Sequence, residues 1–205
     1  MTLIQQTRKW QRTLKAAGYV TGPIDGRWGP KTAAASLAFG ADADTPQPPD
    51  TPPPSSNFDS RTEKNLATLQ KGAQKALRPF VSHAISIAAS MGVELKVICG
   101  LRNKADQEAA KRRGASKAGY GYSWHNYGMA IDFGCFRGRS YLDSDSPSEA
   151  SRVYATIGKI AGDYGIEWGG NWRTFKDYPH FHVDVGHSTP NAADRRKLYA
   201  GDFSY

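Results

Sequence analysis

Two short stretches contain the residues best suited to catalysis. The first, Ser123–Asp132, places an imidazole and a carboxylate, His125 and Asp132, on either side of a glycine turn. The second, Asp177–His182, lies further along the chain and contains two histidines. Two imidazole nitrogens and one carboxylate oxygen form the three-ligand set of a hydrolytic zinc site with an open fourth position. The pattern therefore predicts a metallopeptidase in which one histidine of the second stretch completes the zinc site.

The surroundings of these residues support the same chemistry. Asp132 stands in an apolar run, 129–133, where an unpaired carboxylate would be costly and a bound cation would offset that cost. Asp177 lies three residues before His180, and Pro179 fixes one backbone angle between them. A carboxylate just outside the coordination sphere suits a general base that takes a proton from the attacking water. We therefore predict that Asp177 is the catalytic base.

The third metal ligand has two candidates. His180 and His182 alternate on a predicted strand and so share one face. We favour His180 as the ligand, which leaves His182 beside the cleft, and the reverse assignment stays open. The remaining histidines, His83 and His187, are expected to be ordinary structural or surface groups.

The region that must position these residues, 59–205, predicts a mixture of helices and strands. Apolar residues at helical spacing before and after Pro79 indicate two packed helices ahead of the first strand. In chain order we then expect strand 94–99, helix 104–113, strand 129–133, helix 147–163 and strand 181–185. Helices come first and antiparallel strands follow, so the predicted class is α+β, with a small antiparallel sheet flanked by helices.

The first 40 residues predict a separate all-α module. Apolar residues at helical spacing indicate a helix over 2–17, a loop rich in glycine and proline follows at 22–30, and a second helix runs from Pro30 to Phe39. Residues 41–58 are rich in proline and poor in apolar residues, so we expect a semi-rigid linker there. The predicted domains are therefore 1–40, 41–58 and 59–205.

Motifs in the module carry a first family resemblance. They are the runs Trp10–Leu14, Gly18–Tyr19, Gly22–Gly26 and Trp28–Thr32. These runs resemble the small helical peptidoglycan-binding domain of many cell-wall hydrolases, although that domain usually continues with a third helix. The resemblance implies that 1–40 is a truncated peptidoglycan-binding module. The alternative is a basic helical hairpin that only packs on the catalytic domain.

The region 59–205 carries a second resemblance over nearly its whole length. The motifs are Ser123-x-His125-x-x-Gly128-x-Ala130-x-Asp132, the run Glu167–Trp172, and Asp177-x-Pro179-His180-Phe181. They are similar to those of the VanY-type zinc peptidases, in particular the L-alanyl-D-glutamate endopeptidases of phage endolysins. The resemblance implies that His125, Asp132 and His180 bind Zn²⁺. It also implies that Asp177 is the base.

Four further residues are assigned to the substrate side of the site. An arginine after the first strand, followed by a glutamine, matches Arg102 and Gln107, and the resemblance implies that they contact carboxylate or carbonyl groups of the substrate. A planar, permanently charged guanidinium suits a carboxylate. We place Ser123 where it orients the loop or a ligand, and His182 either behind the metal ligands or at the cleft wall.

Charge and composition limit the partners. Lys and Arg number 27 against 19 Asp and Glu, which favours a polyanionic partner such as an acidic wall polymer. Basic runs with interleaved aromatic residues are lacking, so we expect no nucleic-acid partner. The sequence has no apolar run long enough to span a membrane, and we expect a monomer with no stable membrane insertion. Cys99 and Cys135 are expected to be reduced thiols in the core.

These observations together predict a modular endolysin that degrades peptidoglycan for host cell lysis, with L-Ala–D-Glu as the bond cleaved. Two alternatives stay open, a D-alanyl-D-alanine carboxypeptidase and a non-catalytic wall-binding protein with a structural zinc. The first residues lack the apolar run of a signal peptide. We therefore expect synthesis in the host cytoplasm, with access to the periplasmic wall after another factor has permeabilised the membrane.

Overall fold

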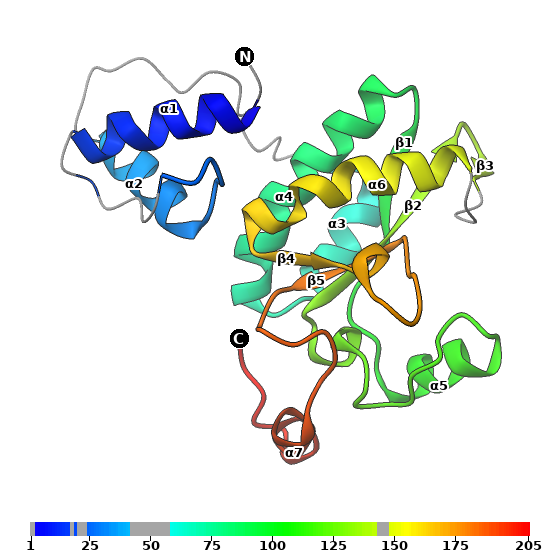
Figure 1. The fold of residues 1–205 in the computed structure, drawn as a ribbon. Coiled ribbons are helices and arrows are strands. Elements are labelled where there is room, and N and C mark those ends of the chain that lie inside the picture. Colours follow the sequence, from blue (N-terminus) through cyan, green and yellow to red (C-terminus); the bar gives the residue numbers. More distant parts are fainter. Residues whose placement is uncertain (1–2, 17–18, 20–23, 42–57, 143–147) are drawn as a thin grey trace.

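The computed structural model describes residues 3–16, 19, 24–41, 58–142 and 148–205. Figure 1 shows a two-helix N-terminal module beside a larger body in which helices flank a sheet. The predicted linker lies almost entirely outside the described residues, so the domain boundaries stay a prediction. Within the described ranges, no helix combines the length and the apolar character needed to cross a membrane.

A single buried glutamine organises the N-terminal module. The module consists of α1 (Leu3–Ala16) and α2 (Pro30–Ala41), close to the predicted bounds. Gln11 on α1 is 1% exposed, and its Oε1 accepts a hydrogen bond of 2.9 Å from the backbone N–H of Gly26. Its Nε2 donates to Asp25 Oδ1, Arg27 O and Thr32 Oγ1 at 3.0, 2.8 and 3.1 Å. The side chain thereby fixes the loop that leads into α2.

The larger body is built on an antiparallel sheet, which confirms the predicted α+β class. The strands are β1 (Glu94–Cys99), β2 (Ala130–Arg137), β3 (Ser140–Tyr141), β4 (Ile166–Trp168) and β5 (His180–Val183). Their order is β1-β2-β5-β4, and β3 pairs with β2. The central strand, β2, therefore joins segments that are far apart in the sequence.

The register of the sheet brings the predicted ligands together. Asp132 on β2 is paired with His180 on β5 and, on the other side, with Cys99 at the end of β1. Side chains alternate along a strand, so the neighbours of Asp132, Ile131 and Phe133, point to the opposite face of the sheet and are fully buried. One face of the sheet thus belongs to the core and the other carries the candidate site.

Three helices cover the core face. They are α3 (Ser60–Ala67), α4 (Lys71–Ser90) and α6 (Glu149–Ala161), seen together in Figure 1. Phe80 of α4 is fully buried, and its ring centroid lies 6.0 Å from that of Phe133 and 5.2 Å from that of Phe181. Burial of such aromatic side chains is a main source of stability. The helices thereby fix the two strands that carry Asp132 and His180.

The structure differs from the prediction in how its helices and strands are divided. Pro79 lies inside α4, and the break between the first two helices falls at 68–70. Leu77 and Phe80 on either side of the proline are fully buried, so core packing offsets the lost backbone hydrogen bond. The polar helix α5 (Lys104–Arg112) is present as predicted, whereas β3, β4 and the C-terminal helix α7 (Ala192–Ala200) were not predicted.

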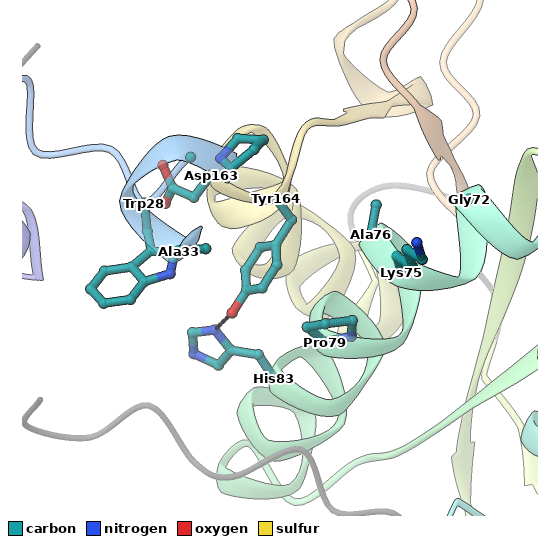
Figure 2. Close-up of a pocket in the computed structure, with 11 residues that line it drawn as sticks. Trp28, Ala33, Gly72, Lys75, Ala76, Pro79, His83, Asp163 and Tyr164 are labelled. Atoms are coloured by element: carbon teal, nitrogen blue, oxygen red, sulfur yellow. Dashed lines mark hydrogen bonds between the residues drawn. The ribbon is translucent and has the colours of Figure 1, made fainter. Parts of the chain in front are cut away.

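A cavity of about 330 Å³ lies where the N-terminal module meets the larger body (Figure 2). Trp28 comes from the module, whereas Lys75, His83 and Tyr164 come from the larger body. His83 Nδ1 lies 2.9 Å from the Tyr164 hydroxyl, and Asp163 lines the same cavity as Trp28. The module therefore packs on the larger body, and wall binding by the module stays a prediction.

Candidate metal centre

A short helical turn places His125. The 3₁₀ helix η1 (Trp124–Tyr127) begins after Ser123, whose Oγ accepts a hydrogen bond of 3.4 Å from the backbone N–H of His125. Gly128 ends the turn at φ 64°, and a Cβ there would lie 3.0 Å from the backbone nitrogen of Gln70. The site requires a glycine at this position because an L side chain would meet both strain and crowding. Ser123 thus orients the ligand loop, as the sequence indicated.

The backbone fixes which nitrogen of His125 faces the site. Nδ1 of His125 lies 2.7 Å from the carbonyl oxygen of Gly100, a distance at which Nδ1–H donates to the carbonyl. This bond leaves Nε2 facing Asp132, where the nitrogen can carry a proton or, once deprotonated, bind a cation. A backbone carbonyl that holds the second ring nitrogen is the usual support of a metal-binding histidine.

Three ligand atoms converge in the buried site. Nε2 of His125 lies 3.0 Å from Oδ1 of Asp132 and 3.2 Å from Nδ1 of His180, and the last two atoms lie 3.2 Å apart. Ligands at the usual zinc distances in a tetrahedral arrangement would be about 3.3 Å apart. The triangle formed by His125 Nε2, Asp132 Oδ1 and His180 Nδ1 therefore has the size and the donor types of a zinc site. It brings together the three residues that the sequence predicted as ligands.

The pKa shifts of His125 and Asp132 show that the buried carboxylate requires positive charge beside it. Burial lowers the pKa of His125, but the Asp132 carboxylate more than offsets this effect and raises it to about 10. Burial opposes ionisation of Asp132, but His125 and His180 outweigh it and hold its pKa well below the usual value. The buried carboxylate is thus balanced by positive charge. A divalent cation would supply that charge and replace the proton on His125.

Cys99 lies beside the triangle but outside the ligand set. Its Sγ, an atom of His125 and an atom of Asp132 lie within 4.8 Å of one another. However, the sulfur is 3.8 Å from Nδ1 of His125, the nitrogen already used by Gly100, and it accepts a hydrogen bond of 3.0 Å from Nε of Arg102. Cys99 is therefore a support for Arg102, and both cysteines are free thiols.

Arg102 reaches the triangle from the loop after β1. Its guanidinium contacts Oδ2 of Asp132, the carboxylate oxygen that the histidines leave free. The side chain is 14% exposed and lines the cleft, so it can meet a ligand there. Direct contact with substrate, which the sequence predicted for Arg102, stays a prediction.

Asp177 lies in the same cleft as the triangle. Burial raises the pKa of its carboxyl, and the nearby charge of Asp132 adds to this effect, whereas His180 and His125 oppose it. The backbone N–H of Asp177 donates to the carbonyl oxygen of Gly169 at 3.2 Å, which fixes the turn before β5. A carboxyl whose pKa is raised accepts a proton more readily than an ordinary carboxylate, as a general base requires. The position suits the predicted base.

The structure places His182 behind the candidate ligands and not on the substrate side of the site. This residue is fully buried between Trp124, with ring centroids 6.1 Å apart, and Trp172, at 6.2 Å, so it does not form the cleft wall. Within the described part of the chain, neither ring nitrogen has a hydrogen-bond partner. Burial and the neighbouring histidines lower its pKa to about 2, so it is neutral. His182 supports the site from within the core, and His180 is the histidine that meets Asp132.

The structure also corrects the predicted role of Gln107. Its side chain is fully buried and is not among the residues that line the cleft. Nε2 donates to Ser116 Oγ and to the carbonyl oxygen of Ala118, both at 2.9 Å, and Oε1 accepts from Asn126 Nδ2 at 3.2 Å. Gln107 therefore ties the loop at 114–123 to the turn that carries His125. The sequence did not predict this role, because no residue pattern marks a glutamine whose buried amide forms hydrogen bonds to a loop.

The triangle opens into a cleft of about 540 Å³. Its walls include Arg102, Arg113, Lys117, Tyr141, Trp172, Phe175, Asp177, Ser188 and Thr189. Aromatic and charged side chains around a concave site of this size suit a short peptide. The arrangement offers a cation site, a nearby proton acceptor and room for a substrate in one place.

Comparisons with known proteins agree with this chemistry. Residues 116–183, which contain the triangle and Asp177, match the model of an M15 peptidase family described as D-alanyl-D-alanine carboxypeptidase. A peptidoglycan L-alanyl-D-glutamate endopeptidase, CwlK of Bacillus subtilis (strain 168), is 32% identical over 107 residues, which cover 47% of this chain and 64% of the relative. An L-alanyl-D-glutamate peptidase of Listeria phage A118 is 29% identical over 125 residues, covering 61% of this chain and 41% of the relative.

A solved structure is also similar. The L-Ala D-Glu endopeptidase ChiX of Serratia marcescens has 28% sequence identity and a TM-score of 0.44, over 62% of this chain and 88% of that one. The chain spans less than two thirds of the length of each of these two curated relatives. The segment that holds the triangle is nevertheless covered by the family match. The part of this chain that carries the candidate metal centre is thus similar to the peptidases of the M15 family.

Proposed function

We propose that this protein hydrolyses the L-alanyl–D-glutamate bond in the peptide stems of peptidoglycan, with Zn²⁺ as its cofactor. The observation that carries the proposal is the convergence of His125, Asp132 and His180 in the cleft that also holds Asp177. The names of the relatives from Bacillus subtilis and Listeria phage A118 supply the bond.

Metal binding, proton transfer and orientation of the site are assigned to different residues. His125, Asp132 and His180 would hold the ion, which when bound polarises the scissile carbonyl and favours ionisation of water. Asp177 takes the proton of the attacking water and passes it to the leaving amine. Arg102 keeps Asp132 oriented through its free oxygen. Its guanidinium is also near enough to the cleft to contact a substrate carbonyl or carboxylate.

The proposal extends to the biological role. A peptidase domain joined to a module that holds peptidoglycan would remain at an insoluble polymer, because tethering raises its effective concentration there. The protein would then act as a monomeric endolysin on the wall of a bacterial host, after another factor has opened the membrane. The relative from Listeria phage A118 supports the phage role.

A carboxypeptidase acting on D-alanyl-D-alanine is the second candidate. The description of the matching family model favours it, and the metal ligands suit both reactions equally. A wall-binding protein with a structural zinc is less compatible with the structure, since Asp177 stands in an open cleft beside the triangle.

Digestion of purified peptidoglycan separates these candidates. The full chain is incubated with sacculi, with and without a chelator, and the soluble fragments are analysed by mass spectrometry. The proposal predicts a new free amine on D-glutamate and no release in chelator. Release of terminal D-alanine would establish the carboxypeptidase, and intact muropeptides with zinc-loaded protein would establish the binding protein.

A further inference from the structure

Two side chains from distant segments of the chain contact each other in the lining of the cleft. Nζ of Lys117, on the loop at 114–123, lies 4.2 Å from the centroid of the Phe175 ring. Phe175 is 40% exposed and stands two residues before Asp177, on the segment that leads to β5. Both side chains line the cleft that contains His125 and Asp132. The only described contact of the Lys117 ammonium is thus an aromatic face, a weak attraction at an exposed site.

The backbone on either side of Lys117 is anchored. Gln107, fully buried, donates hydrogen bonds of 2.9 Å to the Ser116 hydroxyl and to the carbonyl oxygen of Ala118. Asn126 connects Gln107 to the turn of His125. The position of Lys117 relative to the metal centre is therefore fixed by buried contacts, while its own side chain is exposed to the cleft. A charged side chain on a backbone anchored in this way is preorganised to bind a ligand.

The charge of the cleft favours an anionic substrate. Its cationic lining residues are Arg102, Arg113 and Lys117, against the carboxylates of Asp132 and Asp177. The guanidinium of Arg102 forms an ion pair with Asp132. No ion pair of Lys117 or Arg113 is found among the described residues. A bound dication would add to the positive excess, so a carboxylate on the substrate would be attracted here.

We propose that Lys117 binds the free α-carboxylate of the D-glutamate residue and leaves Phe175 when the substrate enters. The inference rests on the proposed L-alanyl–D-glutamate substrate. D-glutamate has two carboxyl groups, and the next amide bond of the stem uses only the γ-carboxyl. Lys117 is then a specificity-determining residue that distinguishes a carboxylate from a carboxamide at this position.

Two matched substrates and three variants test the proposal. The substrates are N-acetyl-L-alanyl-γ-D-glutamyl-L-lysine and its α-carboxamide. The variants are Lys117→Met, Phe175→Leu and, as a control, Lys104→Met on the exposed start of α5. Lys117→Met is expected to raise KM for the carboxylate substrate about three- to tenfold, with kcat little changed. KM for the carboxamide should stay constant, and Phe175→Leu should keep the preference for the carboxylate.

The outcomes are distinct. An equal loss on both substrates would mean that Lys117 only closes the cleft, and it would overturn the inference. Equal KM values of the unchanged protein for both substrates would do the same. If neither peptide is cleaved, binding of both to the zinc-loaded full chain is measured by calorimetry. A carboxylate preference that disappears in Lys117→Met would then support the inference while the proposed bond fails, and no preference would refute both.

Discussion

Nε2 of His125 lies 3.2 Å from Nδ1 of His180, although 55 positions separate the two residues. Both nitrogens are within 3.2 Å of the same oxygen of Asp132, in a buried environment. Three potential donor atoms at this spacing are held by separate supports, namely a backbone carbonyl for His125 and the β2-β5 register for the other two. Such preorganisation favours a bound cation.

The two histidines of β5 are expected to respond differently to substitution. His180→Leu removes a ligand and should weaken Zn²⁺ binding more than about 100-fold, beyond the loss typical of residues that only support ligands. His182→Leu keeps the ligand set and replaces a neutral imidazole that has no hydrogen-bond partner among the described residues, so its Zn²⁺ affinity should stay within about tenfold of the unchanged protein. Competition with a chromogenic chelator measures both. Stronger loss in His182→Leu would reverse the assignment.

Asp177 is predicted to serve catalysis and not metal binding. Asp177→Asn keeps the shape of the side chain but removes the proton acceptor, so kcat should fall about 100- to 10,000-fold. Zinc content, measured on the same preparation, should remain one ion per chain. Full wall lysis by the variant would remove the assignment of Asp177 as the base.

Gln107 is predicted to act through the loop at 114–123. Gln107→Leu leaves the carbonyl oxygen of Ala118 without its buried donor, which should cost about 1–3 kcal/mol in the free energy of unfolding. Amide hydrogen exchange at 116–118 should become faster, while Zn²⁺ affinity is unchanged. If exchange at the loop is unaffected and only substrate binding weakens, Gln107 contacts the substrate as the sequence had indicated.

His83 gives the protein a dependence on pH that is independent of the metal. Burial lowers its pKa in the folded state below the ordinary value of 6.5. The unfolded chain therefore binds a proton more readily, so stability is full above pH of about 6.5 and falls as the pH drops below it. His83→Gln should reduce this fall by at most about 1 kcal/mol, since the ring is only partly buried. Thermal unfolding of both proteins between about pH 5 and 7.5 checks this, and identical profiles would contradict it.

Residue types and spacing were enough to predict the α+β class and which three donor side chains converge, whereas their binding of a metal stays a prediction. His125, Asp132 and His180 have chemistry that their surroundings make conspicuous, because a carboxylate in an apolar strand demands a partner. The roles of Gln107 and His182 could not be predicted in this way, since burial of a polar side chain depends on which loop or ring packs over it. The strand β4 has only three residues, too few for a periodic signal.

A crystal structure of the full chain with zinc, using anomalous scattering to locate the ion, tests the central claim most directly. The account predicts one ion within about 2.0–2.2 Å of His125 Nε2, Asp132 Oδ1 and His180 Nδ1, with Asp177 nearby but not bound to it. An ion bound by Cys99 or His182 in place of His180, or no ion at His125 and Asp132 in zinc-saturated crystals, would contradict it.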